Sequence, residues 1–143
     1  MTRPEPDDEL YRAGLQVRRE VLGDEHVDRA SASADAFTAP FQDHVTRHAW
    51  GAVWTRDELG RRERSLVTLA LLAALGRTDE LAMHVRGALT NGVTVDEIAE
   101  VLLHTAVYAG APAANSAFAV AHRTLLDAGV LPRSGPDGTA QNG

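Results

Sequence analysis

Two stripes of acid and imidazole side chains are the strongest chemical signals in this chain. Glu80 and His84 lie four residues apart, so on a helix their side chains meet on one face. A carboxylate beside an imidazole raises its basicity and fixes its tautomer, which gives a proton donor or acceptor near neutral pH. The same spacing is typical of an ordinary surface pair. The two residues are therefore a candidate acid–base pair, with a surface role as the alternative.

The second stripe consists of Glu100, His104 and Tyr108, on a segment otherwise built of Val, Leu and Ala. Buried imidazole and phenol groups need hydrogen-bond partners. These two either satisfy each other or a helix carbonyl, or line a polar pocket to which Asn115 adds its amide from the start of the last predicted helix. The spacing leaves both outcomes open.

Aromatic and cationic side chains are concentrated between residues 46 and 64. Both tryptophans of the chain, Trp50 and Trp54, lie here. Tryptophans bind ring faces, and arginine forks bind carboxylates through two bonds. The alternative is structural, with the tryptophans as core or interface anchors and the arginines as solvated partners of nearby glutamates. Five arginines give a local positive field that suits a small dianion: Arg47, Arg56, Arg61, Arg62 and Arg64.

Composition excludes several functional classes. The 143 residues include 14 basic side chains, all of them Arg, and 20 acidic ones, for a net charge of -6. Without Cys or Lys the chain has no disulfide framework, thiol catalysis, Cys-based metal site or Schiff-base lysine. A net acidic domain without basic runs is a poor binder of nucleic acid or anionic membrane.

Other special sites and targeting signals are not apparent in the sequence. His44 and His48 are four residues apart but have no obvious third ligand, and no phosphate loop, nucleophile elbow or dinucleotide fingerprint occurs. We therefore expect neither a metal nor a cofactor. The apolar run at 69–75 is far shorter than the roughly 20 residues that span a bilayer. With a polar N-terminus, this predicts a cytoplasmic protein.

Helices must position these groups, because the punctuation of the chain is helical throughout. No run of alternating β-formers suggests a sheet, and the Ala/Leu content of 66–75 favours a helix over a buried strand. Capping boxes are predicted at Thr55 and Thr94, a helix start at Thr78, and stops at Gly23, Gly76, Asn91-Gly92 and Gly129. The fold class is therefore all-α, with helical segments at 10–22, 24–34, 40–52, 61–75, 78–90, 95–109 and 113–128.

The domain organisation follows from length and composition. We expect a flexible N-terminus at 1–6, a single helical domain at 7–132 and a disordered, Gly- and polar-rich tail at 133–143. A domain of this size buries only about 68–70% of its chain surface. Its length therefore points to one subunit of a symmetric assembly.

Taken in order, several blocks of this sequence resemble the 4-carboxymuconolactone decarboxylase family. The similarity extends from about Leu10 to Val130, nearly the whole predicted domain. So many spaced blocks are more specific than any single short motif. The blocks are Val17–Arg29, Thr46–Gly51, Trp54–Arg56, Arg64–Leu66, Glu80–Leu81, His84, Asn91–Val93 and Pro112–Asn115.

The resemblance implies a fold shared with the alkylhydroperoxidase D group, a bundle of about six to seven helices in a ring-shaped homo-oligomer, commonly a hexamer. It implies a cofactor-independent lyase that converts 4-carboxymuconolactone, a small dianionic lactone of protocatechuate catabolism, to 3-oxoadipate enol-lactone and carbon dioxide. Peroxidase relatives carry two cysteines where this chain has Arg77 and Glu80, so their redox chemistry is absent. Many family members have Cys at the position of Ala109.

The resemblance also suggests site roles. His84, oriented by Glu80, is the expected proton donor to the ring carbon. The remaining candidates are Arg47 and Arg64 for a carboxylate or oxyanion, Trp50 and Trp54 as an apolar wall, and His104, Tyr108 and Asn115 as a second polar wall. The alternatives are a helical oligomer that binds a ligand without turnover, or a paralogous decarboxylase or isomerase of another lactone or β-keto acid.

Overall fold

The computed structural model describes residues 8–133, and this part of the chain is helical, without a strand. The predicted all-α class is thus confirmed. The predicted flexible N-terminus at 1–6 lies outside the described residues, as does the predicted tail except for Arg133. The elements are α1 (Glu9–Leu22), α2 (Asp24–Ser33), α3 (Ala39–Val45), the π-helical turn η1 (Thr46–Gly51), α4 (Arg61–Leu75), α5 (Thr78–Thr90), α6 (Val95–Ala109) and α7 (Ala111–Asp127).

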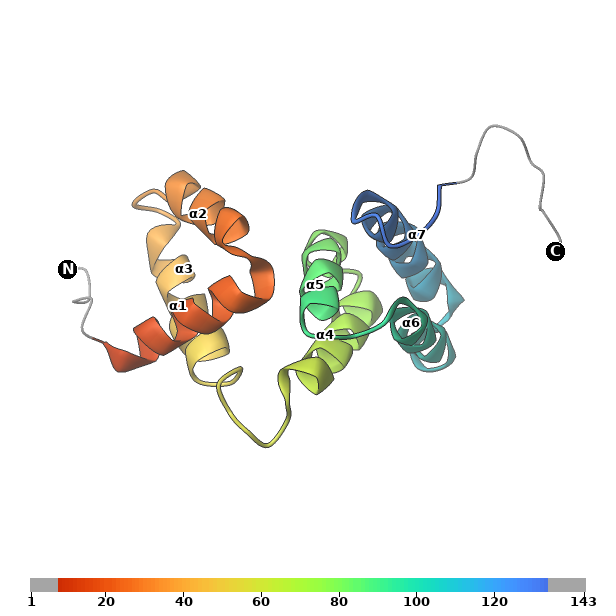
Figure 1. Ribbon diagram of the computed structural model, residues 1–143, viewed down its shortest axis with the longest axis horizontal. Helices are drawn as coiled ribbons and strands as arrows, with labels where there is room; N and C mark the ends of the chain where they lie inside the picture. Colours follow the sequence, from red (N-terminus) through yellow and green to blue (C-terminus); the bar gives the residue numbers. More distant parts are fainter. Residues whose placement is uncertain (1–7, 134–143) are drawn as a thin grey trace, which may run out of the picture.

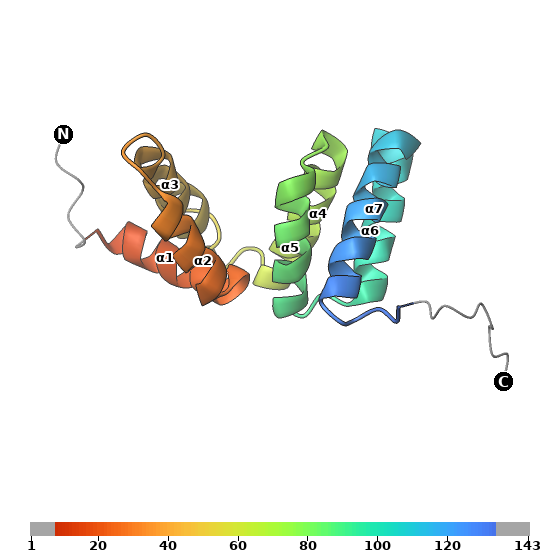
Figure 2. The same cartoon turned by 90° about the horizontal axis from the view of Figure 1, so that it is seen from above.

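The helices are arranged in groups along the long axis of the molecule. Figures 1 and 2 show α1, α2 and α3 at one end, the pair α4 and α5 in the middle, and α6 with α7 at the other end. The main core lies between α4, α5, α6 and α7, where Leu69, Leu81, Ile98 and Leu102 are fully buried. Burying each such side chain contributes about 1.5–3 kcal/mol, so this bundle supplies most of the hydrophobic stabilisation.

A second, smaller core joins the first group to the bundle. Trp50 of η1 packs with Val17 and Val21 of α1 and is only 4% exposed. Gly14 of α1 permits this contact, because a Cβ there would overlap the Thr46 carbonyl oxygen and lie 2.7 Å from the Gly51 nitrogen. The close approach of two backbones therefore fixes η1 against α1.

Helix ends follow the local sequence at most positions. The capping box of Thr94 and Glu97 forms in both directions, and Gly76 closes α4 in the left-handed conformation at φ 71°. The predicted helix start at Thr55 is wrong, whereas the start at Thr78 is confirmed without a cap bond. The Thr55 hydroxyl donates to the Gly51 carbonyl instead of capping a new helix, and residues 55–60 form turns and bends. Thr78 is the first residue of α5 and makes no side-chain cap bond.

The segment predicted as one helix at 40–52 is divided. After α3 the backbone widens into η1, where the Ala52 amide donates to the Arg47 carbonyl over 2.7 Å and the Trp54 amide to the Ala49 carbonyl over 3.0 Å. Such π-turns occur mostly at functional sites, since they change the direction of the side chains that follow. Here η1 carries Trp50 into the small core.

The outer face of α4 and α6 is apolar and exposed. Val107 is 76% exposed and Leu71 is 56% exposed, and hollows of about 440 and 380 Å³ lie along this face. No helix within residues 8–133 has the length and apolar character needed to span a membrane.

Candidate active site

Three aromatic rings form a cluster where η1 and the turn after it meet α5, with Trp50 on η1, Trp54 in the turn and His84 on α5. The Trp50 and Trp54 centroids are 4.9 Å apart, and both rings stack on the His84 imidazole, at 6.0 and 6.3 Å. Gly87, one turn further along α5, lets α1 come close, because its Cβ position is 3.1 Å from the Val21 side chain. The structure thus brings His84 together with two tryptophans that precede it in the sequence by 30 positions or more.

Burial dominates the electrostatics of His84. Burial lowers the pKa of the imidazole from 6.5 to about 4, the field of Glu80 acts in the opposite direction, and His26 lowers it further. The expected gain in basicity from Glu80 is therefore overridden. No hydrogen bond between Glu80 and His84 occurs in the described structure, and Glu80 is exposed. In the free protein His84 is thus a neutral imidazole at pH 7.

Arg47, the first predicted carboxylate ligand, is already engaged. Its guanidinium forms an ion pair with Asp8 and lies over the Tyr11 ring, 5.2 Å from the centroid. Its side chain is 15% exposed. Arg47 therefore faces the first turn of α1, and a substrate carboxylate would have to replace Asp8.

Arg64, the second predicted ligand, lies in the first turn of α4. One terminal nitrogen donates to the Arg56 carbonyl over 3.2 Å, and its Nε atom is buried without a partner. Arg61 and Arg62, two other cations of the predicted positive field, pair with Glu20 and Glu97. The arginines between 47 and 64 thus do not converge on one point.

The second predicted polar wall lies elsewhere in the protomer. His104 and Tyr108 of α6 contact each other, with ring centroids 4.9 Å apart, but Tyr108 is 80% exposed and His104 lines the hollows of the α4–α6 face. Both residues are exposed in the described structure, since neither α4 nor α7 covers them. Asn115 is exposed in the first turn of α7, and the described structure records no side-chain bond that ties it to the two rings.

Two basic residues near the ring cluster were not predicted as site residues. Arg18 of α1 donates to Gln42 Oε1 over 3.0 Å and to Thr46 Oγ1 over 3.3 Å, while its Nε is buried without a partner. Burial lowers the pKa of this guanidinium. His26 of α2 lies close enough that Arg18 lowers the pKa of its imidazole, after a larger effect of burial.

A sequence signal for Arg18 existed. Its neighbours three and four residues away on the helix are Gly14, Leu15, Val21 and Leu22, none of them acidic. A cation on such a face has no local partner and must find polar groups from another element. The structure therefore places a guanidinium without a carboxylate partner, two imidazoles and an aromatic wall around the α1–α5 junction. This set can bind an anion and move a proton in a site with little water.

Comparison with known proteins agrees with this chemistry. Residues 39–123 match the carboxymuconolactone decarboxylase family. The chain is 49% identical to the 4-carboxymuconolactone decarboxylase of Acinetobacter baylyi over 126 residues, which cover 88% of this chain and 94% of that protein. It is 44% identical to the nitrosuccinic acid decarboxylase of Metarhizium robertsii over 131 residues, 89% of this chain and 92% of that protein.

A third relative covers a shorter stretch. The 4-carboxymuconolactone decarboxylase of Pseudomonas putida is 56% identical over 41 residues, which is 29% of this chain and 85% of the compared sequence. The family resemblance seen in the sequence blocks is thereby confirmed. Together with the full-length match and the all-helical fold, this establishes that the chain belongs to the carboxymuconolactone decarboxylase family.

Proposed function

We propose that this protein decarboxylates 4-carboxymuconolactone to 3-oxoadipate enol-lactone and carbon dioxide, without a cofactor, in protocatechuate catabolism. The observation that carries the proposal is the half-buried His84 imidazole stacked against Trp50 and Trp54, in a chain 49% identical to a relative with that activity in its name. That the enzyme works in the cytoplasm stays a prediction.

The reaction needs no external electron sink. The bond between the ring carbon and its carboxylate breaks, carbon dioxide leaves, and the electron pair delocalises through the ring double bond to the lactone carbonyl. A proton then adds to carbon and gives the enol-lactone. The protein therefore has three tasks, namely holding the carboxylates, stabilising the enolate oxygen and delivering one proton.

His84 is suited to the proton transfer because of its setting. Burial keeps the pKa of the free imidazole at about 4. A dianion bound beside it raises that pKa, and the field of Glu80 acts in the same direction. The imidazole thus takes up a proton when the substrate binds and passes it to the ring carbon, while the two tryptophan rings keep water away and favour loss of the charged carboxylate.

The other predicted ligands contribute to the proposed site only under specific conditions. Arg47 contributes only by exchanging Asp8 for a substrate carboxylate, and Arg64 by turning its unpartnered Nε toward the ligand. His104, Tyr108 and Asn115 act as a second polar wall only where a neighbouring copy presents them.

We also propose a ring-shaped homo-oligomer, with six copies, that uses the exposed α4–α6 face. Large apolar side chains are exposed on this face, which favours association in water. They are Val67, Leu71, Leu75, Leu103 and Val107. Measuring the mass by light scattering tests this. Leu71→Asp is expected to shift the mass to the protomer, and an unchanged mass would move the interface to another face.

A cofactor-free assay tests the reaction. Enzymatically generated 4-carboxymuconolactone is mixed with the protein, and its ultraviolet absorbance and the release of carbon dioxide are followed. Loss of the lactone with stoichiometric carbon dioxide is the expected result. Saturable binding without turnover would instead identify a ligand-binding protein.

One observation favours a second candidate. The relative from Metarhizium robertsii, 44% identical, is named for decarboxylation of nitrosuccinic acid, which is also a small dicarboxylate. A nitro group can accept the electron pair as a lactone carbonyl does. Competition between the two substrates in the same assay distinguishes them, since the true substrate has the higher kcat/KM.

A further inference from the structure

A pocket of about 520 Å³ lies between the start of α2 and the side of α5. Its volume is within the range of about 300–1,000 Å³ typical of small-molecule sites. His26 and Arg29 of α2 line one side, and Met83 and Arg86 of α5 line the other. Leu22 lines the pocket and also packs against the small core that contains Trp50, so the pocket borders that core.

Two guanidinium groups, those of Arg29 and Arg86, line the pocket with His26, and a third, that of Arg18 of α1, lies outside the lining but close enough to act on the same imidazole. After burial, the charges of Arg18, Arg29 and Arg86 are what lower the pKa of His26. Arg18 is held by the neutral partners Gln42 and Thr46, and no carboxylate in the described structure pairs with it. The pocket lining thus carries two guanidinium groups and the carboxylates of Asp24 and Glu25, and Arg18 adds a further positive charge nearby.

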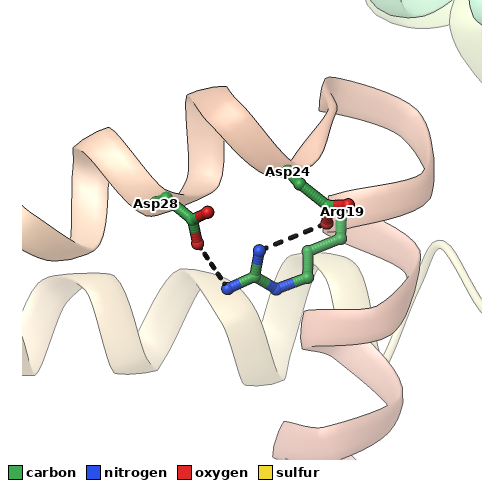
Figure 3. Close-up of polar contacts among 3 residues, drawn as sticks. All are labelled: Arg19, Asp24 and Asp28. Carbon is green, nitrogen blue, oxygen red and sulfur yellow. Dashed lines mark hydrogen bonds and ion pairs between the residues drawn. The ribbon is translucent and has the colours of Figure 1, made fainter.

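One of the two acidic groups that line the pocket is already paired with an arginine outside it. Figure 3 shows Arg19 of α1 between Asp24 and Asp28 of α2, which it bonds over 3.2 and 2.8 Å. These ion pairs join α2 to α1 and compensate the negative charge of Asp24, which lines the pocket. It leaves Glu25 as the uncompensated acid opposite Arg18, Arg29 and Arg86.

The pocket communicates with His84. His26, which lines the pocket, is close enough to act electrostatically on the His84 imidazole of α5. A ligand held by guanidinium groups at one end can therefore extend to the proton donor and the tryptophan wall at the other.

We propose that the α2–α5 pocket is the carboxylate-binding subsite of this enzyme, in which Arg29 and Arg86 bind a small dicarboxylate and, with the nearby charge of Arg18, select dianions over monoanions. The assignment rests on the proposed function for its placement beside the reacting carbon. These residues take the place of Arg47 and Arg64 as the main anchors of the substrate anion, because Arg47 is engaged by Asp8 and Arg64 by a backbone carbonyl.

Intrinsic fluorescence provides a direct probe of this subsite. The only two tryptophans of the chain, Trp50 and Trp54, both stack on His84, so their emission reports on the site alone. The protein is titrated with succinate as a dianion and butyrate as a monoanion of similar size. Wild type is expected to give a saturable change with succinate at a Kd at least tenfold lower than with butyrate.

Variants then identify the anchors. Arg86→Gln and Arg18→Gln are expected to raise the Kd for succinate and the KM for the lactone at least tenfold, because the first loses a charge-assisted bond and the second a nearby positive charge. Arg86→Lys retains the charge without the forked geometry, so its Kd and KM are expected to lie between those of wild type and Arg86→Gln. Arg123→Gln, which removes the same charge from exposed α7, is the matched control and changes either value less than twofold. Arg86 is exposed, so its replacement tests binding even where Arg18→Gln unfolds the protein.

The outcomes separate the subsite from the reaction. Succinate binding that is lost in the Arg86 variant, with no lactone turnover by wild type, refutes the proposed function and keeps the subsite. Lactone turnover with an unchanged KM in both the Arg18 and Arg86 variants overturns the subsite and keeps the function. Wild type that binds neither succinate nor the lactone overturns the subsite as well.

Discussion

Helices α5 and α6 carry stripes of the same sequence type, yet the structure treats them in opposite ways. On α5, His84 lies beneath Trp50 and Trp54 and is largely buried. On α6, His104 and Tyr108 cover only each other, and Tyr108 is 80% exposed. Four-residue spacing places side chains on one helix face but does not determine what that face meets.

The difference comes from distant segments. The α5 stripe is covered because Gly14 and Gly87 let α1 approach η1 and α5 closely, which brings Trp50 of η1 and Trp54 of the following turn over His84. The α6 stripe lies on the side of α6 where the described residues supply no further helix. A buried imidazole can change its protonation with its ligand, whereas an exposed one follows the solvent. This contrast is the reason that we propose His84 of α5, and not His104 of α6, for the proton transfer.

The largest expected effect separates the two histidines. His84→Ala should lower kcat by 10²-fold or more, because acid–base groups contribute about 10²–10⁴-fold, whereas folding stays intact. The assay is lactone turnover with circular dichroism as the folding check. Near-normal turnover by His84→Ala would remove this residue from the proton-transfer role and leave the contrast purely structural.

The next effect concerns acid stability. The unfolded chain binds a proton on His84 near pH 6.5, but the folded protein does so only near the lowered pKa of about 4. Between these values the unfolded state holds more protons, so stability falls as the pH drops through this window, by up to about 3 kcal/mol. Burial of His26 acts in the same direction.

Urea unfolding at pH 7, 5.5 and 4.5 measures this loss. His84→Gln should flatten the pH dependence over this range, whereas His104→Gln should retain the wild-type slope. Equal slopes in wild type and His84→Gln would mean that the imidazole is solvated in the folded protein.

The features predicted correctly from sequence are those decided locally. The Thr94 capping box and the Gly76 stop depend on residues within a few positions, and both form as expected. The failure at Thr55 is also local, since its hydroxyl donates back to Gly51 and does not cap forward. The π-turn was missed because its two wide bonds depend on how η1 packs on α1.

The candidate site was predicted in part. Spacing and resemblance selected Trp50, Trp54 and His84, which the structure brings together. They did not select Arg18 or His26, because the partners of these residues come from α3, η1 and α5, and no sequence spacing encodes those contacts. Conversely, the sequence predicted Arg47 as a carboxylate ligand, but its guanidinium forms an ion pair with Asp8.

A smaller effect tests what covers the α5 stripe. Gly14→Ala places a Cβ against the Thr46 carbonyl and the Gly51 amide, which are backbone atoms that cannot rotate away. We expect a loss of about 2 kcal/mol or more in unfolding free energy, comparable to other overpacked sites, and a red-shifted tryptophan emission. Gly129→Ala is a control for the α7 end, where the cost comes from its positive φ and nothing lies within 4 Å of the added Cβ. Emission unchanged in Gly14→Ala would show that α1 is not what shields the rings.

The smallest effect is expected on α6. His104→Ala and Tyr108→Phe each change the exposed stripe, so kcat should fall less than about threefold, the scale of substitutions that remove no buried partner. The measurement is lactone turnover at concentrations where light scattering gives the assembled mass, with Leu71→Asp as the unassembled reference. A loss near that of His84→Ala in the assembled protein only would mean that a neighbouring copy brings the α6 stripe to the site. The two stripes would then form the two walls of one pocket, and the difference between them would be a property of the isolated protomer.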